Sequence, residues 1–133
     1  MHSPDSTGSA PKPCVLVVDD DDGMRKLLEV ALSRHGFRVR VTADGHEAVQ
    51  LYQTHKDDID AVILDVRMPI YDGPKTLADL QRVNPLVRAV FVTGFPGDYN
   101  VEDLLAFGAA GVFKKPFSLL ELVEFLRKLI TPD

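Results

Sequence analysis

Short apolar runs alternate with longer amphipathic stretches five times along this chain of 133 residues. The runs are residues 15–18, 37–41, 61–64, 90–92 and 111–113. Three of them are apolar throughout, which is typical of strands buried on both faces, whereas 37–41 alternates with Arg38 and Arg40 and is expected at or near an edge. Strict alternation of strands and helices requires right-handed parallel crossovers. The sequence therefore predicts an α/β fold: one doubly wound, five-stranded parallel sheet with five helices on its two faces.

Helix signals frame the amphipathic stretches. Gly36 and Gly108 are placed to end the first and fourth helices, and Asp44 is placed to cap the second. Ser118 and Glu121 have the spacing of a capping box at the start of the last helix. The inward face of that last helix is predicted to consist of Leu119, Leu122, Val123, Leu126 and Ile130.

The net charge and the lengths of the apolar runs argue against two classes of function, nucleic-acid binding and membrane insertion. Twenty acidic against fifteen basic residues give a net charge of -5, which disfavours direct binding of nucleic acid. No apolar run approaches the roughly 18 residues of a membrane span. Residues 1–12 are small and polar, so we expect a disordered leader followed by one domain over 13–131, in the cytoplasm. Cys14, the single cysteine, is expected to be a buried thiol.

Chemically active side chains follow four of the five predicted strands. Asp19 and Asp20 follow the first strand, and Asp65 ends the third. Thr93 ends the fourth strand and Lys115 follows the fifth. Ligand sites in such sheets lie at the carboxyl ends of the strands, so these five side chains are expected to meet there. Three converging carboxylates repel one another, and an all-oxygen site suits magnesium. Each residue alone has an ordinary structural explanation, but the set predicts a metal and phosphate site.

These residues belong to a longer pattern that resembles the response-regulator receiver family of two-component signalling. The motifs are VVDD at 17–20, LDVRMP at 64–69 with Gly73, VTG at 92–94, and KPF at 115–117. The resemblance covers about residues 13 to 131 and implies the flavodoxin-like receiver fold, with strand order 2-1-3-4-5.

The resemblance implies a role for each acid. Asp65 is the expected phosphoacceptor. Asp20 and Asp65 are expected to hold a magnesium or manganese ion directly, with the backbone carbonyl of Arg67 as a third ligand. Asp19 is expected to reach the ion mostly through water. Phosphoryl transfer of this kind rests on positioning and charge neutralisation, and the domain is not expected to turn over any other substrate.

The resemblance also implies roles for the remaining site residues and partners. Thr93 is expected to hydrogen-bond the phosphoryl group, and Lys115 to pair with Asp65 and then with the phosphoryl oxygens. A cis bond before Pro116 is expected to aim that lysine. The donor is expected to be a histidine kinase or a histidine phosphotransfer protein. The readout, to a downstream effector or fused output domain, is expected on the face of the fourth helix, fifth strand and fifth helix, with a homodimer left open.

Several positions depart from the family pattern or tune it. Val112 stands where the family usually has Tyr or Phe, and Phe113 is expected to point to the opposite side of its strand. Arg67 and Phe95 occupy positions that set how long the phosphoryl group lasts, and Gly94 belongs to the same modulating set. The aromatic part of the usual switch is therefore expected to differ here.

Three other functions compete with this interpretation. Asp20-x-Asp22-Gly23 superficially resembles the nucleophile motif of haloacid-dehalogenase-type phosphatases, which normally need a longer chain and a cap. A flavin carrier on the same fold needs a Ser/Thr/Gly-rich phosphate loop after the first strand, where this chain has four aspartates. The third alternative is a receiver-like interaction module that is not phosphorylated.

Overall fold

Five parallel strands form a single sheet in the order β2-β1-β3-β4-β5, as the sequence and its resemblance predicted. The computed structural model describes residues 11–94 and 99–131. The strands are β1 (Cys14–Val18), β2 (Arg38–Thr42), β3 (Ala61–Asp65), β4 (Ala89–Thr93) and β5 (Gly111–Lys114). The predicted leader, residues 1–12, lies almost entirely outside the described ranges, so the domain boundary stays a prediction.

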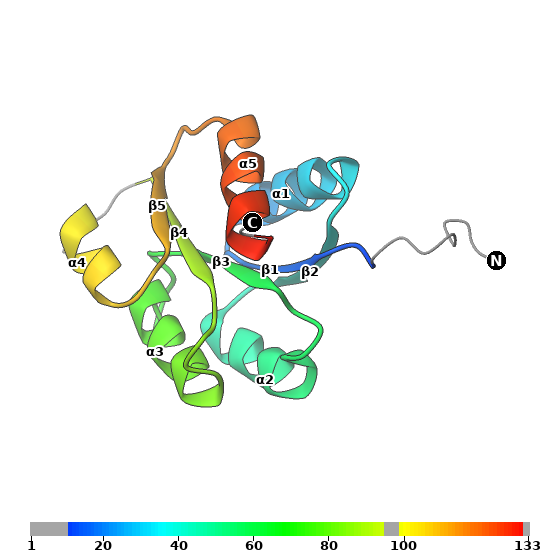
Figure 1. The fold of residues 1–133 in the computed structure, drawn as a ribbon. Helices are drawn as coiled ribbons and strands as arrows, with labels where there is room; N and C mark the ends of the chain where they lie inside the picture. The colour runs from blue at the N-terminus through cyan, green and yellow to red at the C-terminus, as the bar shows by residue number, and fades with distance from the viewer. Residues whose placement is uncertain (1–10, 95–98, 132–133) are drawn as a thin grey trace.

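Helices cover both faces of this sheet (Figure 1). Those on one face are α1 (Asp22–Arg34) and α5 (Leu119–Ile130), and those on the other are α2 (Gly45–His55), α3 (Gly73–Val83) and α4 (Val101–Ala106). No helix in the described part of the chain combines the length and apolar character needed to cross a membrane.

The core has two halves because successive strand side chains point to opposite faces. Val15 and Val17 pack with the residues of α1 and α5, whereas Leu16 and Val18 pack with those of α2 and α3. Every residue of β1, β3 and β4 is buried, including the thiol of Cys14, as predicted. These central strands hold the carboxyl edge of the sheet rigid, which fixes the position of anything attached there.

Strand β2 lies at the edge of the sheet, as the alternation of its sequence predicted. Arg38 on this strand makes a two-bonded ion pair with Asp58 at 2.9 and 3.0 Å. Charged side chains on an edge strand discourage pairing with a second sheet. Phe37, expected as part of the strand, precedes it and is buried.

Side-chain caps fix the starts of the helices. Asp44 accepts a hydrogen bond from the amide of Glu47, and Ser118 accepts one from Glu121. Both bonds of a capping box are present at Asn100 and Asp103, which the sequence analysis did not single out. The predicted inward face of α5 is confirmed: Leu122, Val123 and Leu126 are buried, and Leu119 and Ile130, near the ends of the helix, are half-buried and pack against the same core.

Candidate functional site

The side chains predicted to meet at the carboxyl edge of the sheet do so. Asp19 follows β1, Asp65 ends β3 and Thr93 ends β4, and all three are buried. Asp20 is exposed at the mouth of the site. One carboxylate oxygen from each of Asp19, Asp20 and Asp65 lies within 4.8 Å of the others. Residues far apart in the sequence thus form one acidic cluster because their strands are parallel and adjacent.

Lys115 supplies the opposing charge. Its Nζ lies 3.6 Å from Oδ2 of Asp19 and 3.6 Å from Oδ1 of Asp65. Its backbone amide donates to the carbonyl of Thr93 at 2.8 Å, and the bond to Pro116 is cis, as the resemblance implied. Gly94 lies against the lysine's aliphatic stem: a Cβ there would be 3.4 Å from Lys115 Cδ. The ammonium group is therefore held over the carboxylates from the neighbouring strand.

Burial dominates the electrostatics of the cluster. Burial, and after it the charge of Asp19, raise the pKa of Asp65 to about 7 against the opposing charge of Lys115. Burial also raises the pKa of Asp19, against a hydrogen bond from the Asp21 amide at 2.9 Å and the charge of Lys115. One ammonium group does not balance three carboxylates in a partly desolvated site. The site therefore favours the binding of an additional positive charge beside the carboxylates.

The residues present fit a hard divalent cation. Carboxylate oxygens are the ligands that magnesium prefers, and an exposed acid beside two buried ones leaves room for the waters that this ion retains. The cluster consists of oxygen ligands alone, without a sulfur or imidazole that would favour zinc. Asp19, Asp20 and Asp65 thus form an acidic pocket that suits Mg²⁺ and phosphorylation chemistry.

Thr93 has an unused hydroxyl at this site. Its Oγ1 is buried and has no hydrogen-bond partner in the part of the chain that the structure describes. Buried polar atoms are nearly always paired, so an unpaired one beside a cluster of charges calls for an explanation. A ligand with acceptor oxygens, bound next to Asp65, would supply the missing partner.

The backbone after Asp65 is fixed by a close contact that the sequence analysis did not assign. The amide of Gly73 donates to the carbonyl of Val66 at 2.9 Å. A Cβ at Gly73 would lie only 2.5 Å from the Asp65 carbonyl oxygen, so any larger residue displaces backbone. The sequence indicates Gly73 only as part of the motif. Pro74 lies in the first turn of α3, a position that suits proline.

The modulating positions are only partly described. Val112 pairs with Phe91 and packs toward α2, α3 and α4, whereas Phe113 points to the other face and stacks edge-on against Phe125 at 5.5 Å. The expectation that Phe113 points to the opposite side of its strand from Val112 is confirmed. Arg67 is exposed just after the acidic cluster, and its role as a ligand stays a prediction. Phe95 lies outside the described residues.

The family model of the response regulator receiver domain matches residues 15–127. The chain therefore belongs to the receiver domains of two-component signalling, the class that its strand order and acidic pocket define. These are signalling domains and generally not enzymes.

Individual relatives agree with this assignment. The chain is 34% identical over 126 residues to the sensor kinase CckA of Brucella abortus, covering 95% of this chain and 13% of that protein. It is 36% identical over 122 residues to the response regulator MprA of Mycolicibacterium vanbaalenii, covering 90% of this chain and 52% of that protein. The chain thus spans about half or less of the length of these curated relatives.

A solved structure shows the same fold with a metal ion. The receiver domain of the sensor histidine kinase PA1611 from Pseudomonas aeruginosa superposes with a TM-score of 0.81 at 27% identity, over 92% of this chain and 99% of that one. That structure has a magnesium ion coordinated in its active site cleft.

Proposed function

We propose that this receiver domain accepts a phosphoryl group on Asp65 from a phosphohistidine, in a reaction that requires Mg²⁺. The observation that carries the proposal is the buried Asp65 carboxylate, which shares one pocket with two further acids and the ammonium group of Lys115. The donor would be a histidine kinase or a histidine phosphotransfer protein, because the family belongs to two-component systems.

The residues of the pocket have separate tasks in this reaction. A carboxylate oxygen of Asp65 attacks phosphorus, the phosphorus–nitrogen bond of the donor breaks, and the imidazole leaves with that electron pair and takes up a proton. Lys115 exchanges its attraction to Asp65 for one to the transferred oxygens. The hydroxyl of Thr93 donates its free hydrogen bond to the same group.

Asp20 and Asp65, with the carbonyl of Arg67, would hold the ion directly, and the more buried Asp19 would act mainly through water. When bound, Mg²⁺ supplies positive charge to the phosphoryl oxygens and offsets the repulsion among the carboxylates. Arg67 and Phe95 would then influence how long the acyl phosphate survives.

The readout would use the face formed by α4, β5 and α5. Phosphorylation adds about -1.5 to -2 charge to the pocket, which sits at the ends of β3, β4 and β5. On this face, exposed Glu124 and Lys128 of α5 lie beside Phe113 of β5 and would offer charged contacts to a partner, to a fused output domain or to a second copy of the chain. Arg127 lies on the α1 side of the same helix, where it donates to the carbonyl of His35 at 2.6 Å. Consistent with such partners, the domain would act in the cytoplasm.

Intact-protein mass spectrometry after incubation with acetyl phosphate tests the proposal. We expect a gain of one phosphoryl mass that requires Mg²⁺ and disappears in Asp65→Asn. A matched control is Asp57→Asn, which removes an exposed carboxylate in the turn after α2 and should leave phosphorylation unchanged. No gain with acetyl phosphate or with a phosphorylated histidine kinase would instead support an interaction module that is not phosphorylated. Steady turnover of an added phosphomonoester would support a phosphatase.

A further inference from the structure

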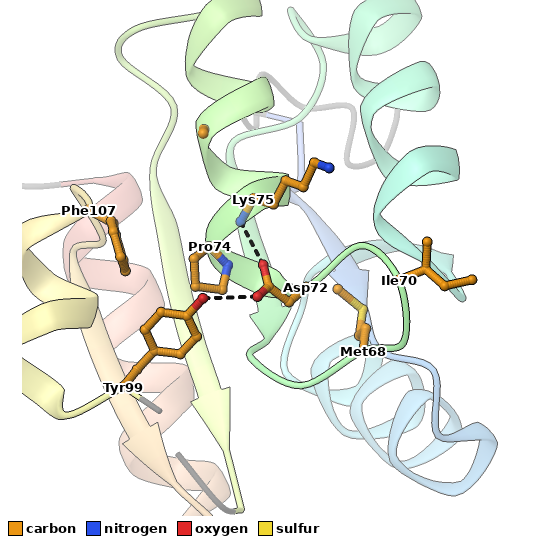
Figure 2. Close-up of a pocket in the computed structure, with 8 residues that line it drawn as sticks. Met68, Ile70, Asp72, Pro74, Lys75, Tyr99 and Phe107 are labelled. Atoms are coloured by element: carbon orange, nitrogen blue, oxygen red, sulfur yellow. Dashed lines mark hydrogen bonds between the residues drawn. The ribbon is translucent and has the colours of Figure 1, made fainter. Parts of the chain in front are cut away.

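Tyr99 connects the start of α4 to the start of α3. Its hydroxyl donates to Oδ2 of Asp72 at 3.0 Å, while Oδ1 of the same carboxylate accepts from the amide of Lys75 at 2.9 Å (Figure 2). One oxygen of Asp72 thus caps α3 and the other holds the residue that leads into α4. The Tyr99 ring also packs edge-on against Phe107, the C-cap residue of α4, with ring centroids 5.7 Å apart.

Asp72 is tied to the backbone of the acidic pocket. Its neighbour Gly73 donates to the carbonyl of Val66 and leaves no room for a Cβ beside the carbonyl of Asp65. Backbone therefore touches backbone here, without a flexible side chain between the two segments. A change in the position of the Asp65 backbone is therefore transmitted directly to Asp72.

Helix α4 depends on a small number of contacts. It has six residues, of which Leu104 is buried, and a helix this short is not stable on its own. Its far end is held by α3, where Nε2 of Gln81 donates to the carbonyl of Phe107 at 2.9 Å. Helix α3 therefore holds α4 at both ends, through Asp72 and Tyr99 at the start and through Gln81 at the finish.

Strand β5 has no polar side chain at the position next to Phe91 that could connect the pocket to α4. Val112 stands there with an apolar, half-buried side chain, which cannot hydrogen-bond to the free hydroxyl of Thr93. The polar connection from the pocket toward α4 that the described residues show runs through the loop between β3 and α3 instead.

We propose that the hydrogen bond from Tyr99 to Asp72 couples the state of Asp65 to the position of α4. Tyr99 is then a positioning residue, which acts through Asp72 and Gly73. The coupling rests on the proposed function in that phosphorylation would be the natural change at Asp65. By reciprocity, a partner that binds α4 would in turn influence the pocket.

A double-mutant cycle followed by hydrogen–deuterium exchange tests this coupling. Asp65→Asn changes the charge in the pocket without a phosphodonor, and Tyr99→Phe removes the hydroxyl while keeping the ring against Phe107. We expect Asp65→Asn to change the exchange rate of α4 amides by about threefold or more in the wild-type background, and by less than about 1.5-fold beside Tyr99→Phe. Unchanged exchange in β1 and α5 would show that the variants remain folded.

Tyr71→Phe is the matched control. Tyr71 lies next to Asp72 in the loop between β3 and α3, and its hydroxyl donates to Asp79 on α3. Loss of the Tyr71 hydroxyl should therefore leave the coupling intact. An equal effect of Asp65→Asn on α4 with and without the Tyr99 hydroxyl would overturn the proposal, as would an absence of any effect in the wild-type background. Phosphoryl uptake is measured separately by mass, so failure of the proposed function does not obscure the result of the cycle.

Discussion

The ammonium nitrogen of Lys115 lies 3.6 Å from Oδ1 of Asp65, yet the pKa of that carboxyl remains raised to about 7. Burial and the nearby charge of Asp19 outweigh the attraction of the lysine. The metal-free pocket is therefore a place where negative charge is unfavourable. Its stability and its chemistry should both depend on pH.

The first prediction concerns stability against pH in the metal-free protein. Because the folded pKa of Asp65 lies above its usual value of 3.8, the folded state holds more protons between these two values. The contribution of this group to stability is complete below pH 3.8 and is lost as pH rises through about 7. Asp65→Asn does not titrate. Relative to this variant, wild type should lose about 2 kcal/mol of unfolding free energy between pH 5.5 and pH 8.

Urea denaturation in a chelator, followed by circular dichroism because the chain has no tryptophan, measures this difference. A constant gap between the two proteins across this pH range would contradict the raised pKa. Saturating Mg²⁺ at pH 8 should restore much of the lost stability in wild type and little in Asp65→Asn, because a ligand that binds only the folded state stabilises it.

The second prediction separates two buried hydroxyls. Thr93 and Thr42 both have a buried Oγ1 without a hydrogen-bond partner among the described residues. Replacement of either by valine should leave stability unchanged or raise it by about 1 kcal/mol, because an unpaired buried hydroxyl is removed. Only Thr93→Val should slow phosphorylation, by about tenfold or more, because Thr93 ends the strand next to that of Asp65, whereas Thr42 ends the edge strand β2, which β1 separates from β3. Denaturation and mass-resolved phosphorylation kinetics on both variants check this; equal kinetics would contradict the role of Thr93.

A third prediction follows from the backbone of Ile70. This residue has a φ of 71° and its side chain is fully exposed. A β-branched residue in this region costs about 1–2 kcal/mol, and asparagine tolerates it better. Ile70→Asn should raise the unfolding free energy by about 1 kcal/mol. Leu86→Asn, at another highly exposed apolar site, is the control and should stay within about 0.5 kcal/mol of wild type. Equal behaviour of the two variants in urea would refute the strain.

The fourth prediction concerns the contact behind Asp65. Gly73→Ala places a Cβ only 2.5 Å from the Asp65 carbonyl oxygen, which is a steric clash. This substitution should destabilise the fold by about 2 kcal/mol or more. Gly23→Ala, in the first turn of α1, brings a Cβ to an ordinary 3.5 Å contact and should be neutral or stabilising by up to about 1 kcal/mol. Thermal unfolding of both variants distinguishes the cases; a Gly73→Ala protein as stable as wild type would show that the loop can move aside.

The fold could be predicted because the residue pattern of each strand indicates which of its faces are buried. In the run 61–64 every residue is apolar, as is typical of a strand covered on both faces. In β2, the alternation of apolar residues with Arg38 and Arg40 indicates the edge of the sheet. The site followed from the same logic, since the ends of adjacent parallel strands must converge. The strand pattern thus predicts that Asp19, Asp65 and Lys115 meet, without any knowledge of distances.

What the sequence did not reveal depends on distances between loops. Tyr99 and Asp72 are 27 positions apart and lie in segments without a periodic pattern, so nothing local pairs them. The close approach of Gly73 to Asp65 likewise requires the loop path between β3 and α3. The half-exposure of Leu119 and Ile130 reflects where α5 begins and ends over the sheet, which helical spacing alone does not fix.

The pocket draws its side chains from residue 19 at one end of the chain to residue 115 near the other, through strands β1, β3, β4 and β5. A fragment that lacks β1 or β5 therefore lacks part of the set. Under the proposed function, phosphoryl uptake would require both of these strands to be in place: a molecule without its last strand carries Asp65 without the lysine that faces it.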